Sequence, residues 1–138
     1  MKTNDLVAVK LEPLMALQPM LQYEALLYKK LHGLNGFSNV HWFGVEGDYN
    51  VLVMDLQGPC LGSLFEFCNN EFDLKTILWI ACQMIYRIQS MHDKNFIHRD
   101  LKPENFLIGS GKKTNTLYLI DFGLSKRFKC PKTGQHIM

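Results

Sequence analysis

The sequence predicts an α+β fold in which a sheet-rich first part is followed by a helical second part. Short runs of β-branched and apolar residues, bounded by turn signals, occur early in the chain, at 6–11, 40–45 and 49–56. The longest stretch with helical periodicity comes later, at 74–91, and Gly58 and Pro59 separate the two kinds of segment. Strands first and a long helix afterwards are typical of an α+β protein.

The composition allows one globular domain. Of 138 residues, 47% are hydrophobic and 20% are charged, and 15 Lys and Arg against 13 Asp and Glu give a net charge of +2. These values exclude a disordered tail or a low-complexity linker. The uncharged apolar run 76–86 is shorter than the roughly 20 residues of a membrane span, and Asp5, Lys10 and Glu12 interrupt any signal peptide. We therefore expect no membrane contact and a cytoplasmic and/or nuclear location.

The first strand is predicted at 6–11, a β-branched run that Pro13 closes. A helix follows, with Pro19 in its first turn and its end near Gly33. Its apolar residues recur at spacings of three and four, at Met20, Tyr23, Leu27 and Leu31. Glu24 is expected at the edge of this stripe.

The next strands are predicted at 40–45 and 49–56, where the turn signal 46–48 between them indicates an antiparallel hairpin. Asp73 is a good N-cap for the long helix. The apolar residues of this helix recur at helical spacing, at Leu74, Ile77, Leu78, Ala81, Met84, Ile85, Ile88 and Met91. After the helix we expect a polar loop, a strand, a basic turn and another strand, at 98–105, 106–108, 109–115 and 117–120.

The cysteines leave several states open in principle, namely two disulfides, a zinc site or free thiols. None of the four has the close CxxC spacing that metal ligation favours: Cys60, Cys68, Cys82 and Cys130. We predict buried free thiols, because a free cysteine behaves as a small apolar side chain.

Two polar segments carry residues suited to catalysis. The loop 98–105 places an acid, a base and an amide between a long helix and a strand, and loops held by such elements concentrate catalytic groups. The segment 121–123 follows an apolar strand, and Gly123 is expected to let the chain turn sharply. Asn105 and Asp121 supply two hard oxygen ligands, which suit Mg²⁺ that is held partly by substrate phosphates.

A third segment, Val-Ala-Val-Lys, places the charge of Lys10 on a strand, and Glu24 on the next helix is suited to orient that lysine. In this order, VAVK, HRDLKPEN and DFG resemble the signature set of protein kinases. The sequence is most similar to the casein kinase 1 family, in the segments 7–13, 46–59, 64–68, 94–109 and 120–126.

This resemblance covers residues 7–137 and implies an incomplete, protein-kinase-like bilobal fold of the α+β class. It divides the chain into a partial sheet-rich N-lobe at 1–54, a hinge at 55–59 and the start of a helical C-lobe at 60–138. No glycine-rich loop precedes the first strand, and the chain ends early in the activation segment. We therefore expect a fragment of a longer catalytic domain, which would be inactive as an isolated chain.

The resemblance also implies the catalytic roles. Lys10 would hold the α- and β-phosphates of ATP and pair with Glu24. Asp100 would accept the proton of the substrate hydroxyl, and Lys102 would steady the γ-phosphate. The position of Lys102, two residues after Asp100, indicates Ser or Thr as the acceptor. The protein substrates are expected to be acidic or phosphate-primed.

The remaining implied roles concern the metal and the adenine. Asn105 and Asp121 would bind Mg²⁺, and Asp121 would also contact the nucleotide. Met54 would be the gatekeeper behind the adenine, and the backbone of Asp55, Leu56 and Gln57 would offer hinge hydrogen bonds. Gln57 departs from the apolar residue that is usual in relatives.

Two other interpretations follow from the early chain end and from the charge. A truncated kinase-like module could bind partners or nucleotide without transferring phosphate. The charge is uneven: residues 1–97 hold 7 basic and 10 acidic residues (net −3), and 98–138 hold 8 and 3 (net +5), which predicts an anionic partner near the C-terminal third. A solvated strand accounts for the basic residues at 126–132 better than a nucleic-acid surface does. We expect a monomer that binds no nucleic acid.

Overall fold

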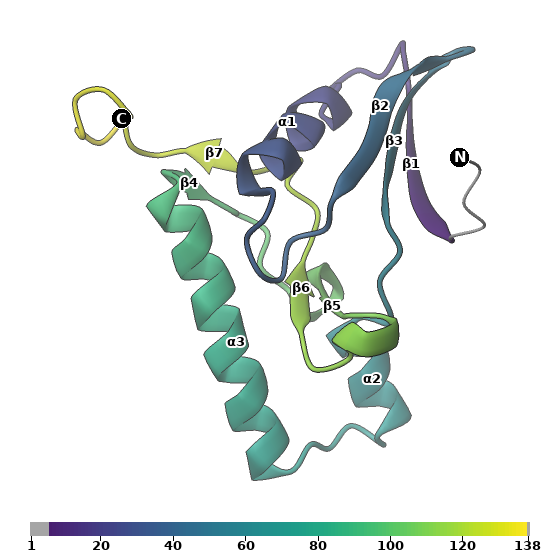
Figure 1. The fold of residues 1–138 in the computed structure, drawn as a ribbon, viewed down its shortest axis with the longest axis vertical. Helices are drawn as coiled ribbons and strands as arrows, with labels where there is room; N and C mark the ends of the chain where they lie inside the picture. The colour runs from purple at the N-terminus through teal and green to yellow at the C-terminus, as the bar shows by residue number, and fades with distance from the viewer. Residues whose placement is uncertain (1–5, 138) are drawn as a thin grey trace.

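The computed structural model describes residues 6–137, so the first five residues of the predicted N-lobe and the last residue of the predicted C-lobe segment lie outside it. The first part of the chain contains β1 (Val7–Pro13), α1 (Leu21–Leu31), β2 (Val40–Glu46) and β3 (Tyr49–Asp55). The second part contains the α-helices α2 (Leu61–Phe67) and α3 (Leu74–Asp93). Between and after them lie short elements: β4 (Phe96–Ile97), η1 (Pro103–Asn105), β5 (Phe106–Ile108), η2 (Gly111–Lys113), β6 (Leu117–Leu119) and β7 (Lys126–Arg127). A sheet followed by helices confirms the α+β prediction (Figure 1).

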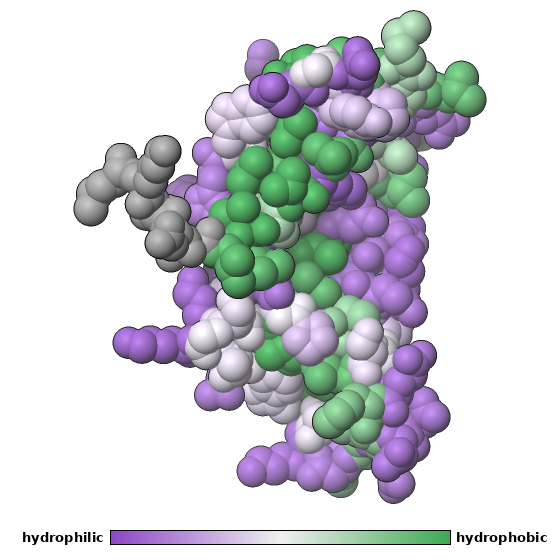
Figure 2. All heavy atoms as spheres, turned by 90° about the vertical axis from the view of Figure 1, so that its right-hand side faces the viewer, coloured by the Kyte–Doolittle hydropathy of each residue, from purple (hydrophilic) through white to green (hydrophobic). Residues whose placement is uncertain are grey.

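Strand β3 is the centre of an antiparallel sheet with the order β1-β3-β2. It pairs with β1 from Val7↔Asp55 to Pro13↔Tyr49 and forms the predicted hairpin with β2. Helix α1 packs across β2 and β3. Strand β1 lies at the sheet edge, and Figure 2, which looks onto this side, shows apolar side chains gathered over the upper half of the face.

Helix α1 begins later than the sequence predicts. It starts at Leu21 with Met20 as its N-cap, so Pro19 precedes the helix instead of occupying its first turn. The Glu12 carboxylate explains this start, because its Oε1 accepts hydrogen bonds from the N–H groups of Met20 at 2.6 Å and Leu21 at 2.9 Å. A carboxylate there satisfies N–H groups that have no partner within the helix and complements its positive end.

The buried face of α1 also differs from the predicted stripe. Met20 and Tyr23 are 38% and 36% exposed, so the prediction that they face the core is wrong, whereas Leu27 and Leu31 are buried as expected. The residues that face inward are Leu21, Glu24, Ala25, Leu27, Tyr28 and Leu31. The face is therefore rotated toward Glu24, which lies inside it and not at its edge.

The long helix α3 confirms its predicted cap, because Asp73 Oδ1 accepts a hydrogen bond from the N–H of Thr76 at 2.7 Å. Much of its predicted apolar stripe is exposed, including Leu74, Ile77, Leu78 and Ile85, and its buried residues are Arg87 and Met91. The sequence did not predict α2, β4 or β7. No helix within the described residues is both long enough and apolar enough to cross a membrane.

The four cysteines are free thiols, as predicted, but they are not buried. Cys68 and Cys82 are exposed, and Cys60 and Cys130 are partly exposed. Cys68 ends α2, and Cys82 lies on the solvent side of α3. The prediction of buried thiols is wrong because these positions face away from the core.

A buried arginine joins α3 to the start of β6. Arg87 is 5% exposed, and its Nε donates to the carbonyl of Leu117 at 2.8 Å. Its Nη2 donates to Gln83 Oε1 at 2.8 Å, and the same oxygen accepts from the N–H of Leu117 at 2.9 Å. These bonds satisfy the buried guanidinium without a carboxylate partner. The side chain lies against Gly36, where an added Cβ would stand 1.7 Å from Arg87 Nε.

We expect Gly36→Ala to lower the free energy of unfolding by about 3 kcal/mol, combining left-handed backbone strain with overpacking. Gly36 has φ +81°, and the new methyl group would displace Arg87 from its bonds. Gly33→Ala is the matched control, because Gly33 has the same φ of +81° but nothing within 4 Å of the added Cβ. Urea unfolding of both variants measures the difference. Equal losses would show that contact with Arg87 contributes nothing.

Candidate active site

A cavity of about 400 Å³ lies between the two parts of the chain. It is lined by β1, α1, β3, the predicted hinge and the segments that follow η1 and β6. The predicted site residues on its wall are Lys10, Glu24, Met54, Asp55, Leu56, Gln57, Asn105 and Asp121. The fold thus brings together residues that are up to 111 positions apart in the sequence.

Lys10 links the strand, the helix and the segment after β6. Its Nζ lies 2.7 Å from Glu24 Oε2 and 3.1 Å from Asp121 Oδ1. The predicted pairing of Lys10 with Glu24 is present, and the contact with Asp121 adds a second carboxylate that the sequence did not predict. Residues from three separate elements therefore converge on one ammonium group.

The charges of this cluster support one another. Burial raises the pKa of the Glu24 carboxyl, whose side chain is 2% exposed, and the hydrogen bond from Lys10 opposes that rise. Burial alone would lower the pKa of Lys10, but the bonds and charges of Glu24 and Asp121 outweigh it and leave that pKa raised. Lys10 therefore stays positively charged beside the cavity.

Helix α1 also positions the backbone at 121–122. Glu24 Oε1 accepts a hydrogen bond from the N–H of Phe122 at 3.3 Å, and the Tyr28 hydroxyl accepts one from the N–H of Asp121 at 3.4 Å. The Tyr28 and Phe122 rings pack edge to face with centroids 4.7 Å apart. Two side chains of one helix thus fix the direction in which Asp121 leaves the strand.

The turn predicted at Gly123 is present, but the residue with the left-handed backbone is Asp121. Asp121 has φ +64°, in the left-handed region, whereas Gly123 does not adopt a positive φ. An added Cβ at Gly123 would make only ordinary contacts, the nearest at 3.6 Å from Met20 Cβ. The chain does turn at Gly123, where the N–H of Ser125 donates to the Phe122 carbonyl at 3.0 Å, while the bonds from α1 hold Asp121 in the less common conformation.

The loop 98–105 forms a second polar cluster around Asp100. Lys102 Nζ lies 2.7 Å from Asp100 Oδ2. Asn105 Nδ2 donates to the same oxygen at 3.2 Å and to the Asp100 carbonyl at 2.8 Å. The hydrogen bond from Lys102 is the main cause that lowers the pKa of Asp100. The carboxylate therefore stays ionised near neutral pH.

His98 connects this loop to the Asp121 segment. Its Nδ1 accepts a hydrogen bond from the N–H of Asp100 at 3.2 Å, so its Nε2 carries the proton that is donated to the Ile120 carbonyl at 2.9 Å. Burial lowers the pKa of His98, which keeps the ring neutral. The sequence included His98 in the loop motif, but its bridging role has no signal in the sequence.

Arg99 is held in a similar way. It has φ +71°, and its Nε donates to the Leu124 carbonyl at 2.6 Å. This bond ties the loop to the segment that follows residues 121–123. The two loops of the site are thus joined at His98 and at Arg99.

The predicted metal ligands share one cavity wall. Asn105 and Asp121 both line the cavity, and the Asn105 amide nitrogen points to Asp100, so its amide oxygen points away from that residue. Within residues 6–137 no cluster of three or more His, Cys, Asp or Glu side chains is placed to hold a metal ion. Two oxygen donors fit Mg²⁺, which usually takes few protein ligands and completes its shell with phosphate and water.

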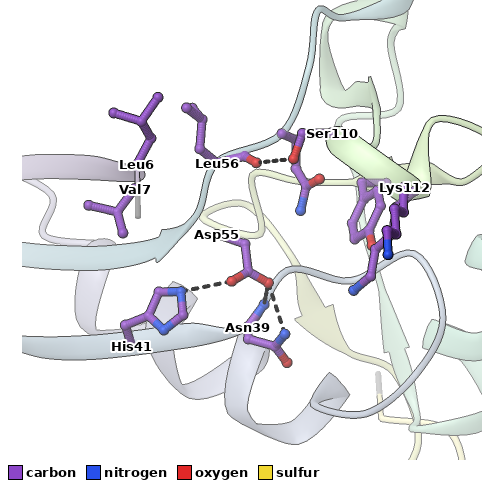
Figure 3. A pocket seen from close by; sticks show the side chains of 11 residues that line it. Leu6, Val7, Asn39, His41, Asp55, Leu56, Ser110 and Lys112 are labelled. Carbon is purple, nitrogen blue, oxygen red and sulfur yellow. Dashed lines mark hydrogen bonds and ion pairs between the residues drawn. The ribbon is translucent and has the colours of Figure 1, made fainter. Parts of the chain in front are cut away.

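The predicted hinge runs between two hydrogen-bonded segments. Met54 is 8% exposed and lines the cavity. The Asp55 side chain points to the opposite side, where it binds Asn39 and His41 (Figure 3). Gln57 Nε2 donates to Ser38 Oγ at 3.1 Å. The Asp55 and Gln57 side chains are therefore both bound to residues that precede or belong to β2.

A comparison with protein-family models agrees with this geometry. The model described as the protein kinase domain matches residues 2–138. The match spans nearly all of the chain, including both polar clusters and the segment between the two parts.

Proposed function

We propose, from the premise that this chain belongs to the protein kinase domain family, that it transfers the γ-phosphoryl group of ATP to Ser or Thr side chains of proteins. Membership of the family supports phosphoryl transfer to protein substrates, with ATP and Mg²⁺ as the general requirement, and an α+β bilobal kinase fold that is present in part. The choice of Ser or Thr and the casein kinase 1 type go beyond the family match.

The observation that carries the proposal is the link between two charged clusters through Asn105, which lines the first cavity and donates to Asp100 Oδ2 at 3.2 Å. Lys10, Glu24 and Asp121 form the first, with contacts of 2.7 and 3.1 Å. Asp100 and Lys102 form the second, with a contact of 2.7 Å. A truncated binding module would have no need for both clusters, whereas transfer requires phosphate positioning and a proton acceptor together.

The residues of this chain would act mainly by placing charge. Lys10 would hold the nucleotide phosphates, and Glu24 and Asp121 would hold Lys10 in position. Asp100 would orient the acceptor hydroxyl and take its proton, while Lys102 would move from Asp100 to the transferred group. Mg²⁺, when bound by Asn105 and Asp121, would neutralise phosphate charge. Such preorganised charge supplies most of the catalysis in phosphoryl transfer.

The casein kinase 1 type rests on the sequence segments named above and on Lys102, two residues after Asp100. We further propose that the substrates are acidic or phosphate-primed, because residues 98–138 carry 8 basic against 3 acidic residues. A monomeric protein in the cytoplasm and/or nucleus is part of the same proposal.

Peptide phosphorylation by the full-length protein tests this function. Three peptides with the same acidic flanks and a single Ser, Thr or Tyr acceptor are incubated with radiolabelled ATP and Mg²⁺. We expect label on the Ser and Thr peptides and none on the Tyr peptide. A fourth peptide, in which Gln replaces the acidic flanks, is expected to react more slowly. Label on Tyr alone, or on none of the peptides, would contradict the proposal.

Lys102→Met is expected to move the acidic limb of the pH profile of kcat to higher pH. The hydrogen bond from Lys102 is the largest cause of the lowered pKa of Asp100, so its loss returns that pKa toward the ordinary value of 3.8. The pKa rises, and the base becomes protonated at a higher pH than in the wild type. Lys94→Met, at the exposed end of α3, is the control. An acidic limb at the same pH as in the wild type would show that Lys102 does not influence the ionisation of Asp100.

A further inference from the structure

A second cavity lies behind the predicted hinge. It has a volume of about 580 Å³ and shares Asp55, Leu56 and Gln57 with the first cavity. All other lining residues of the two cavities differ, so they are separate spaces along the same segment. Figure 3 shows that the floor of the second cavity is formed by side chains from β2, β3 and the segment before β2. The volume is in the range of known ligand and peptide-anchor pockets.

The carboxylate on the floor of this cavity is already satisfied. Asp55 Oδ2 accepts hydrogen bonds from Asn39 N at 2.9 Å and Asn39 Nδ2 at 2.8 Å, and Oδ1 lies 2.7 Å from His41 Nε2 (Figure 3). A carboxylate with three such partners opposes the approach of another anion less than an unpartnered one does.

Two lysines form the opposite rim. Lys112 and Lys113 are exposed on η2, and among residues 6–137 neither forms an ion pair. The turn that carries them is rigidly built. Ser110 Oγ donates to the Leu56 carbonyl at 2.9 Å, and an added Cβ at Gly109 would stand 2.2 Å from the Lys113 carbonyl oxygen. The two positive charges are therefore held beside the hinge by a close-packed backbone.

The third wall is apolar. Val7, at the start of β1, is 42% exposed, and Leu56 is 41% exposed. Both line the cavity, together with the buried ring of Tyr118. A ligand that fits this combination carries negative charge on one side and an apolar group on the other.

We propose that the cavity behind the hinge is a docking site for an acidic peptide segment of a protein partner. Carboxylates of the segment pair with Lys112 and Lys113, and an apolar side chain of the segment packs on Val7 and Leu56. A single-stranded nucleic acid fits less well, because such ligands stack their bases on accessible aromatic rings and Tyr118 is only 4% exposed. The site is independent of phosphoryl transfer and goes beyond the proposed function.

The test uses the full-length protein and a short fluorescein-labelled peptide of glutamate and leucine, with binding followed by fluorescence anisotropy. We expect the double variant Lys112→Glu, Lys113→Glu to bind the peptide about tenfold more weakly, because two attractive contacts become repulsive. The matched control is Lys29→Glu, Lys30→Glu, which changes the charge by the same amount on the last turn of α1. Its affinity is expected to equal that of the wild type.

Two further measurements separate this site from its alternatives. Val7→Thr, which keeps the charge and removes an apolar methyl group, is expected to weaken binding about threefold. Saturation with an ATP analogue is expected to leave the peptide affinity unchanged, because the nucleotide cavity is a separate space along the hinge.

Three outcomes would overturn the proposal. Equal losses in the two double variants would mean that only net charge attracts the peptide. Displacement of the peptide by the ATP analogue would place it in the first cavity. Tighter binding of an RNA oligonucleotide of equal charge, lost in the Lys112→Glu, Lys113→Glu variant, would make the surface a nucleic-acid site. None of these measurements depends on transfer activity, so failure of the proposed function remains distinguishable.

Discussion

Lys10→Met in the full-length protein is expected to lower kcat/KM for phosphoryl transfer by about 10²- to 10³-fold, the loss typical of removing one preorganised charge from a transition state. Lys10 is the group on which the Glu24 and Asp121 carboxylates converge, at 2.7 and 3.1 Å. Methionine keeps much of the side-chain length and removes the charge. Without the ammonium group, two carboxylates face the phosphates and repel them. Steady-state kinetics with varied ATP measures the loss.

The same variant has a consequence for stability that a loss of activity alone does not produce. Burial raises the pKa of Glu24 above its ordinary value of 4.5, and Lys10 opposes that rise. In Lys10→Met the pKa rises further, because the opposing charge is gone. A carboxyl whose pKa is higher in the folded state stabilises the fold at low pH, and this stability is lost as the pH rises through the folded-state pKa. The Tm of the variant should therefore fall from pH 5 toward neutrality relative to the wild type.

Lys29→Met is the control for both measurements, because Lys29 is exposed on α1 and makes no contact with the cluster. It should keep the activity and the pH dependence of Tm of the wild type. A Lys10→Met protein with activity within a factor of a few of the wild type would refute the assignment of the phosphate site.

Asp100→Asn is expected to lower kcat by about 10²- to 10⁴-fold, the range for loss of a general base. The asparagine side chain has nearly the same shape and keeps an oxygen that accepts from Lys102 and Asn105. The fold should therefore survive, and KM for ATP should change little. Rapid-quench measurement of a single turnover isolates the transfer step from product release.

The control for this variant is Asp93→Asn, at the exposed last residue of α3. It removes one carboxylate from the surface and should leave kcat unaltered. A large rise in KM for ATP in Asp100→Asn, without a fall in kcat, would assign Asp100 to nucleotide binding instead of proton transfer.

The sequence predicted the elements whose signal is local. The β2–β3 hairpin follows from two β-branched runs around a turn, and α3 follows from its N-cap and a long apolar periodicity. The short elements have no such signal. Strands β4 and β7 have two residues each and exist because they pair with one another across the chain. Their pairing is a tertiary contact, which local periodicity does not encode.

Helix α1 shows how a distant contact alters a local prediction. The periodicity alone favoured a stripe through Met20 and Tyr23. The helix start is instead set by Glu12, which bonds the N–H groups of Met20 and Leu21 from the end of β1. The inward face then includes Glu24 and Tyr28.

The sequence predicted which residues form the candidate site better than it predicted the contacts between them. The pairing of Lys10 with Glu24 was expected, since Lys10 lies in the VAVK segment and Glu24 lies on the helix that follows it. The contribution of Tyr28 was not, because a tyrosine at helical spacing is usually a core residue and its hydrogen-bond partner lies 93 positions away. The left-handed backbone of Asp121 depends on these bonds and has no signature in the residue itself.

The hydrogen bonds at the predicted hinge restrict where the two parts of the chain can rotate. The N–H of Asp55 is bound to the Asn39 carbonyl on the sheet side at 3.0 Å. The N–H of Gly58 is bound to the Ile108 carbonyl on the helical side at 2.7 Å. The Leu56 carbonyl also accepts a hydrogen bond from Ser110 Oγ on the helical side at 2.9 Å, and Gln57 Nε2 donates to Ser38 Oγ on the sheet side at 3.1 Å. The chain therefore passes from sheet-side to helical-side bonding within two residues, which leaves little unbound backbone about which the two parts can turn.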